Sequence, residues 1–250
     1  MSSPIKADKV YVVHVSSNLE REEHMKQELG RFNIPFEFML KGDLKDLSRE
    51  LVDEYFSGDQ MSGPFCAEQS CALKHIYIYQ KMIEDGVGNA LIFEDDVFLT
   101  DNFIEVFNQC IDEFSSLSEE IRNKGLINFE ESTLRYVPKE RVKEGIVLYE
   151  MDRSRCAGAY FINSNLAKAI VNDVQVNKCD KPLDWYHNTL VDRIALKHFW
   201  CHPAIVQQGS HNGKMASTID DKKHGGIRKI TWKISRWYKQ KIRPLFGSRE

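Results

Sequence analysis

Short apolar runs alternate along the chain with longer segments in which apolar residues recur every three or four positions. The first run, KVYVVHV at 9–15, is a β-branched stretch typical of a buried strand. A helical pattern at 19–32 and a second extended piece at 35–42 follow it. This strand–helix–strand opening predicts a parallel sheet of Rossmann type. Three polar residues are candidates for the N-cap of the helix: Ser16, Ser17 and Asn18.

The same alternation continues to about residue 220 and predicts a single α/β domain over 1–221. Helical spacing predicts a helix over 67–86 that ends at Gly86. An apolar run at 89–99 predicts a strand, and Thr100 or Asp101 is expected to cap the next helix. The remaining expected elements are strands at 125–130 and 145–152, a strand and helix over 156–174, a helix over 181–198 that begins near Pro182, and a strand and loop over 200–218.

Composition is that of a soluble globular protein. The 250 residues are 42% hydrophobic and 28% charged, with a formal net charge of −3. No run approaches the roughly 18–20 apolar residues that span a bilayer, and the first ten residues lack the apolar core of a cleaved signal. Six cysteines show neither a CxxC pair nor metal-finger spacing. These features predict a reduced, cytoplasmic protein.

The segment 222–250 differs from the body of the chain in charge. From Lys222 onward, Glu250 is the single carboxylate among many Lys and Arg residues. Isoleucines and tryptophans recur at helical spacing over 227–245, a pattern typical of an interfacial helix. Packing against the domain and nucleic-acid binding are the alternatives, but the apolar stripe is poorly suited to a phosphate backbone. We therefore predict peripheral association with the anionic inner leaflet and no nucleic-acid partner.

Three consecutive carboxylates, Glu94, Asp95 and Asp96, follow the apolar residues of the run at 89–99. Ligands of open α/β sheets bind outside the carboxyl ends of strands. Carboxylates in such proximity repel one another unless a cation or hydrogen-bond donors compensate. Oxygen-only clusters suit Mg²⁺ or Mn²⁺, which also bind phosphates. The pattern is compatible with a metal–diphosphate site and, equally, with an acidic turn that caps the next helix.

Several segments, in matching order over about residues 9–219, resemble glycosyltransferase family 25, which includes bacterial lipooligosaccharide and collagen galactosyltransferases. The segments that carry the resemblance are VVHVSSNLEREEHM (12–25), AEQSCALKH (67–75), LIFEDDV (91–97), GAYFINSNLAKAIV (158–171), PLDW (182–185) and PAIVQQGSHNGKMASTI (203–219). His14–Val15 stands where the family has Asn-Leu, and two glycines and a serine of the second motif are replaced by Ala67, Ser70 and Lys74. Glu68, Cys71 and His75 are retained.

The resemblance implies an α/β GT-A fold with a mostly parallel sheet. It also implies inverting transfer of a hexose, above all β-linked galactose, from a UDP-sugar to a lipid-linked lipooligosaccharide or lipopolysaccharide acceptor. Mn²⁺ or Mg²⁺ would stabilise charge on the leaving UDP, held by Asp96 with Asp95 in support and His211 joining from a later loop. Asp184, near a helix start, would be the base that takes the proton of the acceptor hydroxyl.

The remaining implied roles concern the two substrates. Donor contacts are expected from eight residues: His14, Val15, Arg21, Glu68, His75, Glu94, Asp95 and Lys214. Trp185 and Tyr186 are expected to stack on the acceptor sugar. Simpler alternatives stay open, because Asp184 could be only an N-cap, Trp185 only a core residue and His75 only a core histidine. Two other functions also stay open: a nucleotidyltransferase, although HVSSNLER is not the Gly-rich basic loop expected of one, and a non-catalytic sugar-nucleotide or membrane-binding protein.

Overall fold

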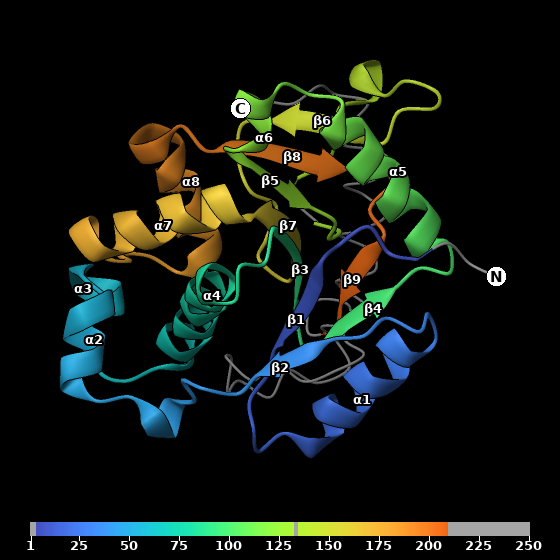
Figure 1. Ribbon diagram of the computed structural model, residues 1–250. Helices are drawn as coiled ribbons and strands as arrows, with labels where there is room; N and C mark the ends of the chain where they lie inside the picture. Colours follow the sequence, from blue (N-terminus) through green and yellow to red (C-terminus); the bar gives the residue numbers. More distant parts are fainter. Residues whose placement is uncertain (1–3, 133–134, 210–250) are drawn as a thin grey trace, which may run out of the picture.

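A seven-stranded sheet forms the centre of the protein in a computed structural model that describes residues 4–132 and 135–209 (Figure 1). Across the sheet the strands follow the order β2 (Glu37–Met39), β1 (Lys9–Val13), β3 (Asn89–Glu94), β7 (Ala159–Asn163), β5 (Gly125–Asn128), β8 (Lys197–Cys201) and β6 (Leu148–Met151). A separate two-stranded sheet pairs β4 (Val97–Leu99) with β9 (Val206–Gln208). The run at 89–99 is therefore two strands in two sheets, divided at Asp95 and Asp96.

The sheet is mixed, and five of its seven strands run in the same direction, which fits the predicted mostly parallel sheet. β1 runs parallel to β2 and β3, and β5 runs parallel to β8. β7 is antiparallel to both of its neighbours, β3 and β5, and β6 is antiparallel to β8. Because β7 is inverted, its first residue, Ala159, pairs with Phe93 near the carboxyl end of β3. The loop before β7 thus reaches the edge where β1 and β3 end, and Glu94 N–H donates to the Gly158 carbonyl at 2.9 Å.

Helices cover both faces of the sheet, in agreement with the predicted α/β class (Figure 1). One face packs against α2 (Arg49–Tyr55), α3 (Gly58–Met61), α4 (Ala67–Glu84), α7 (Ser164–Asn177) and α8 (Leu183–Ile194). The other packs against α1 (Leu19–Gly30), α5 (Phe103–Ser115) and α6 (Glu119–Arg122). Successive side chains of a strand point to opposite faces, so Tyr11 and Val13 join the first core while Val10 and Val12 join the second. Burial on both faces explains why these strands are continuous apolar runs.

The helix ends follow local signals in part. Asn18 caps α1, and its side chain accepts a hydrogen bond from Arg21 N–H at 3.2 Å. α4 ends two residues before Gly86, whose φ of +66° is the left-handed conformation that favours glycine. α5 is preceded by Asn102 instead of Thr100 or Asp101, and Asn102 makes no side-chain capping bond.

α8 begins directly after Pro182, as predicted, and is shorter than expected. It ends at Ile194 because Ala195 adopts a left-handed conformation, and 197–198 belong to β8. Residues 41–66, for which the sequence pattern predicted nothing, contain α2, α3 and the 3₁₀ turn η1 (Leu44–Asp46); a second such turn, η2, spans Lys139–Arg141.

Three predicted features lie outside the described residues: the basic segment 227–245, His211 and Lys214. Within 4–132 and 135–209, every helix is too short or too polar to cross a bilayer.

Candidate active site

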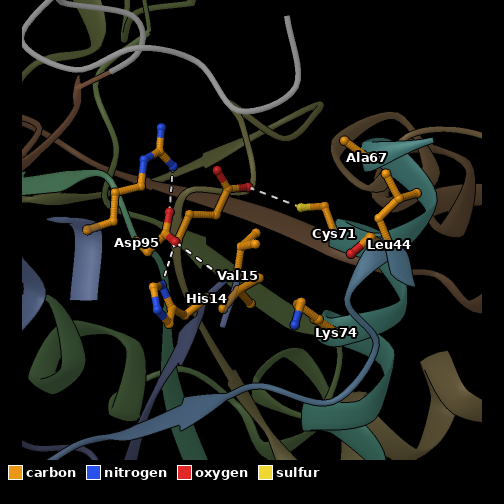
Figure 2. Close-up of a pocket in the computed structure, with 11 residues that line it drawn as sticks. His14, Val15, Leu44, Ala67, Cys71, Lys74 and Asp95 are labelled. Carbon is orange, nitrogen blue, oxygen red and sulfur yellow. Dashed lines mark hydrogen bonds and ion pairs between the residues drawn. The ribbon is translucent and has the colours of Figure 1, made fainter. Parts of the chain in front are cut away.

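A pocket of about 170 Å³ opens where β1 and β3 end and α4 begins (Figure 2). Figure 2 shows His14 and Asp95 on one side of it and Cys71 and Lys74 of α4 on the other. The lining residues are Val13, His14, Val15, Arg21, Leu44, Ala67, Ser70, Cys71, Lys74, Glu94 and Asp95. The pocket therefore lies at the carboxyl ends of parallel strands, and it brings together residues from three of the motifs singled out in the sequence.

Asp95 is bound on both of its carboxylate oxygens by residues of the protein. Oδ1 accepts a hydrogen bond from Arg21 Nη1 at 2.5 Å, and Oδ2 lies 2.7 Å from His14 Nδ1 and 3.4 Å from Val15 N. Burial by itself would raise the pKa of Asp95, but the His14 hydrogen bond and the Arg21 charge outweigh it and lower the pKa. Asp95 is thus an ionised carboxylate whose charge is balanced inside the protein.

Asp96 belongs to the same network. Its Oδ2 lies 3.6 Å from Arg21 Nη2, and its backbone carbonyl accepts from Gly209 N–H at 2.7 Å. Arg21, Asp95 and Asp96 are 7%, 4% and 2% exposed. Arg21 can reach both carboxylates because the first turn of α1, capped by Asn18, starts close to the end of β1.

This arrangement bears on the expected metal site. Asp95 was predicted to support Mn²⁺ or Mg²⁺, and its two oxygens already accept from Arg21 and His14, so its charge is balanced without an ion. Arg21, expected to contact the donor, lines the pocket and also supplies the charge that balances the acidic turn. An ion held by Asp96, with Asp95 in support and His211 joining, stays a prediction.

Glu94 is the carboxylate of the motif that points toward α4. Its Oε2 accepts a hydrogen bond from Gln208 Nε2 at 2.8 Å. Its Oε1 lies 3.8 Å from Cys71 Sγ and 3.9 Å from His75 Nε2. Gln208 lies within a segment that carries the family resemblance, yet nothing in the sequence singled it out, because its partner is 114 positions away.

Gly158 allows this arrangement because it has no side chain. A Cβ at this position would lie 2.3 Å from Gln208 Nε2 and 2.7 Å from Glu130 Oε2, closer than atoms in contact can be. Glu130, a second residue that the sequence analysis missed, is fully buried and accepts a hydrogen bond from Gly158 N–H at 2.8 Å. Burial, together with the charges of Glu94 and Asp96, raises the pKa of Glu130 well above its usual range and thus favours its neutral form.

Asp184 is the second acidic residue of the site with a raised pKa. Burial raises it and the charge of Glu94 adds to the effect, while the Trp185 backbone N–H and the charge of Arg135 oppose it. A carboxylate with a raised pKa is a better proton acceptor than an ordinary surface aspartate.

The two aromatic residues after Asp184 differ in exposure. Trp185 is 59% exposed and free to contact a ligand, so it is not the core residue of the alternative interpretation. Tyr186 is 0% exposed, and its hydroxyl donates to Asp173 Oδ2 at 2.6 Å. The prediction that Tyr186 contacts the acceptor is wrong, because the helical rotation of about 100° per residue turns it into the core.

His75 and Lys74, neighbours on α4, are both buried. His75 Nδ1 lies 2.7 Å from Tyr160 Oη, which continues the hydrogen-bonded chain to Tyr79 at 2.5 Å and from there to His187 at 3.0 Å. The Nδ1 side of the His75 ring is thus hydrogen-bonded within the core. Lys74, a departure from the family pattern, forms an ion pair with Asp43 at 2.8 Å. Glu68 lies half-buried in the first turn of α4.

Comparisons with known proteins bear out the resemblance. The model of glycosyltransferase family 25 (LPS biosynthesis protein) matches residues 7–186. The chain belongs to this family, and its mixed α/β sheet fits a GT-A-like fold.

Two relatives come from Haemophilus influenzae. One, which is named only as a glycosyltransferase, is 25% identical over 72% of this chain and 61% of its own length. The lipooligosaccharide biosynthesis protein lic2B is 34% identical over 37% of this chain and 35% of its own length. The matches thus span less than two thirds of these relatives. A solved glycosyltransferase involved in glycosylation of the PBCV-1 major capsid aligns with 89% of this chain and 98% of its own, at 10% identity and a TM-score of 0.41.

Proposed function

We propose that the protein is an inverting glycosyltransferase of lipooligosaccharide or lipopolysaccharide biosynthesis that moves a hexose from a UDP-sugar to a glycan acceptor. Family membership across 7–186 and the lipooligosaccharide name of one relative support the reaction class. The observation that carries the proposal to this chain is the position of the pocket, at the carboxyl ends of the parallel strands β1 and β3 and beside the start of α4. Ligands of open α/β sheets bind at this edge, so the pocket is the place proposed for the sugar nucleotide.

Asp184 is the proposed base. As the acceptor oxygen bonds to the anomeric carbon, the bond from that carbon to the UDP oxygen breaks with inversion, and Asp184 takes the hydroxyl proton. The raised pKa of Asp184 supports this assignment, because burial and Glu94 make its carboxylate more basic. Trp185, exposed beside it, is the proposed contact for the acceptor sugar.

Three finer features are part of the proposal. The donor sugar is galactose, by analogy with the family members that the sequence resembles. Dependence on Mn²⁺ or Mg²⁺ stays a prediction, and no step is assigned to an ion at Asp95 because that residue is already bound by Arg21 and His14. The expected cytoplasmic location, peripheral to the inner membrane through 227–245, also stays a prediction, because that segment lies outside the described residues.

The test uses the purified full chain with UDP-galactose or UDP-glucose, a truncated lipooligosaccharide acceptor and a readout of released UDP. Release from one donor, dependent on acceptor, is the expected result. Asp184→Asn should lower the rate by about 10²–10⁴-fold without loss of UDP binding. Asp192→Asn, on the exposed side of the same helix, is the matched control and should change neither quantity.

Other outcomes separate the alternatives. UDP binding without turnover on any acceptor would favour a non-catalytic sugar-nucleotide protein. Release of pyrophosphate from a nucleoside triphosphate, with no release of UDP, would favour a nucleotidyltransferase. Failure to bind any UDP-sugar would refute the proposal outright.

A further inference from the structure

Three side chains with metal-binding atoms converge beside the pocket. Cys71 and His75 lie one helical turn apart on α4, and Glu94 ends β3. Cys71 Sγ, His75 Nε2 and a Glu94 carboxylate oxygen all lie within 4.8 Å of one another. Metal–ligand bonds of about 2.0–2.3 Å place tetrahedral ligand atoms roughly 3.3–3.8 Å apart. The three atoms are therefore close to the spacing of a metal site, and small side-chain rotations complete it.

The His75 ring is held as metal-binding imidazoles usually are. Its Nδ1 is hydrogen-bonded to Tyr160 Oη, which continues to Tyr79 and His187 through the core. When each group in this hydrogen-bonded series donates to the next one toward His187, His75 donates from Nδ1. Its lone pair is then on Nε2, the atom that faces Glu94. A hydrogen bond on the far nitrogen is what fixes the tautomer and orientation of a ligating histidine.

His75 Nε2 also has no hydrogen-bond partner among the described residues, although it is fully buried. Buried polar atoms are almost always satisfied, so an orphaned ring nitrogen aimed at a thiol and a carboxylate points to a ligand at that position. Glu94 Oε1 lies 3.9 Å away, beyond hydrogen-bond distance.

Charge favours a cation at the same point. Arg21 neutralises Asp95 and Asp96 on the far side of the turn, whereas the partner of Glu94 Oε2 among the described residues is the neutral amide of Gln208. A divalent ion between Glu94 and Cys71 would balance this carboxylate and a thiolate together.

We propose that Cys71, His75 and Glu94 bind a thiophilic divalent ion of the Zn²⁺ class. Sulfur and imidazole ligands select such an ion over Mg²⁺ or Mn²⁺, which prefer oxygen. Three protein ligands leave a fourth position, as in catalytic zinc sites. Because Cys71 and Glu94 both line the pocket, that open position faces the space assigned to the donor. The inference goes beyond the proposed function and does not depend on it.

The test is a Co²⁺ titration of the full chain, freed of metal and followed by absorption, with Zn²⁺ added last. The expected result is one Co²⁺ per chain with a thiolate-to-cobalt charge-transfer band that Zn²⁺ abolishes. Cys71→Ser should remove the band, and His75→Gln and Glu94→Gln should each weaken Co²⁺ binding at least tenfold. Cys66→Ser, at the N-cap of the same helix and outside the cluster, is the matched control and should keep the band.

Three outcomes would overturn the proposal: no Co²⁺ binding, a bound Co²⁺ without a thiolate band, or a band that survives Cys71→Ser. Co²⁺ with an oxygen-only spectrum that is lost in Asp96→Asn would locate the ion in the acidic turn instead. The wild-type spectrum alone can refute the proposal, so the test stands even if a variant fails to fold. No sugar nucleotide is present, and failure here is therefore distinct from failure of the proposed reaction.

Discussion

Replacement of Arg21 by Met tests whether this residue is the cation that holds the acidic turn together. The change removes the guanidinium that faces Asp95 and Asp96 but keeps an unbranched apolar side chain. All three residues are almost fully buried, so the change leaves two carboxylates without their cation in a region that water barely reaches. Breaking a buried ion pair by removing one partner costs about 3–5 kcal/mol of the free energy of unfolding. We expect a loss of that size.

The assay is urea unfolding near pH 7, because urea, unlike guanidinium, does not screen charge. Lys26→Met is the matched control on the same helix: Lys26 pairs with Glu22 in water, and its loss should leave stability almost unchanged. Stability equal to that of Lys26→Met would refute the assignment of Arg21.

The pH dependence provides a second, independent check. Burial opposes ionisation of Asp95, but His14 and Arg21 hold its folded pKa below the unfolded value. Ionised Asp95 therefore contributes stability above the unfolded pKa, and this contribution is lost as pH falls through the folded pKa. In Arg21→Met the charge of Arg21 no longer offsets the effect of burial on Asp95, and the pKa of Asp95 rises. The stability difference between the two proteins should shrink as pH falls toward about 4, and a constant difference would contradict the argument.

Three further predictions concern the surroundings of the turn. Gly158→Ala should cost about 1–3 kcal/mol of unfolding free energy, because the added methyl group collides with Gln208 and Glu130. Wild-type stability of this variant in urea would show that the loop can accommodate the methyl group. Folded Glu130 has a raised pKa, so its contribution to stability is full below the unfolded pKa and is lost as pH rises through the folded pKa, at up to about 1.4 kcal/mol per pH unit. Glu130→Gln should remove this decline from urea unfolding measured above the unfolded pKa, and an unchanged pH dependence would contradict the raised pKa. Tyr186→Phe should cost about 1–3 kcal/mol by removing one buried donor of Asp173, which keeps Arg193 and Asn177; the KM for the acceptor should not change, whereas a raised KM at unchanged stability would restore Tyr186 to the acceptor site.

Local patterns predicted the elements well where they carry their own signal. The strands at β1 and β3, the cap at Asn18 and the end of α4 before Gly86 each depend on a few neighbouring residues. The direction of β7 could not be predicted, because a strand buried on both faces reads the same in either direction. The contact between Tyr186 and Asp173 could not be predicted either, because it depends on how α8 packs against α7.

The sequence by itself determined the class of the protein and the motif at its site, because β-branched runs, helical spacing and the Glu94–Asp96 carboxylates are local. Only the tertiary structure decided how that charge is balanced. Arg21 and Asp95 are 74 positions apart, and their contact exists because α1 begins beside the edge where β1 and β3 end. Cys71 and His75 already share a helical face by their spacing, but Glu94 meets them only when β3 packs against α4. Electrostatic compensation and ligand geometry depend on distances in space, which spacing along the chain does not contain.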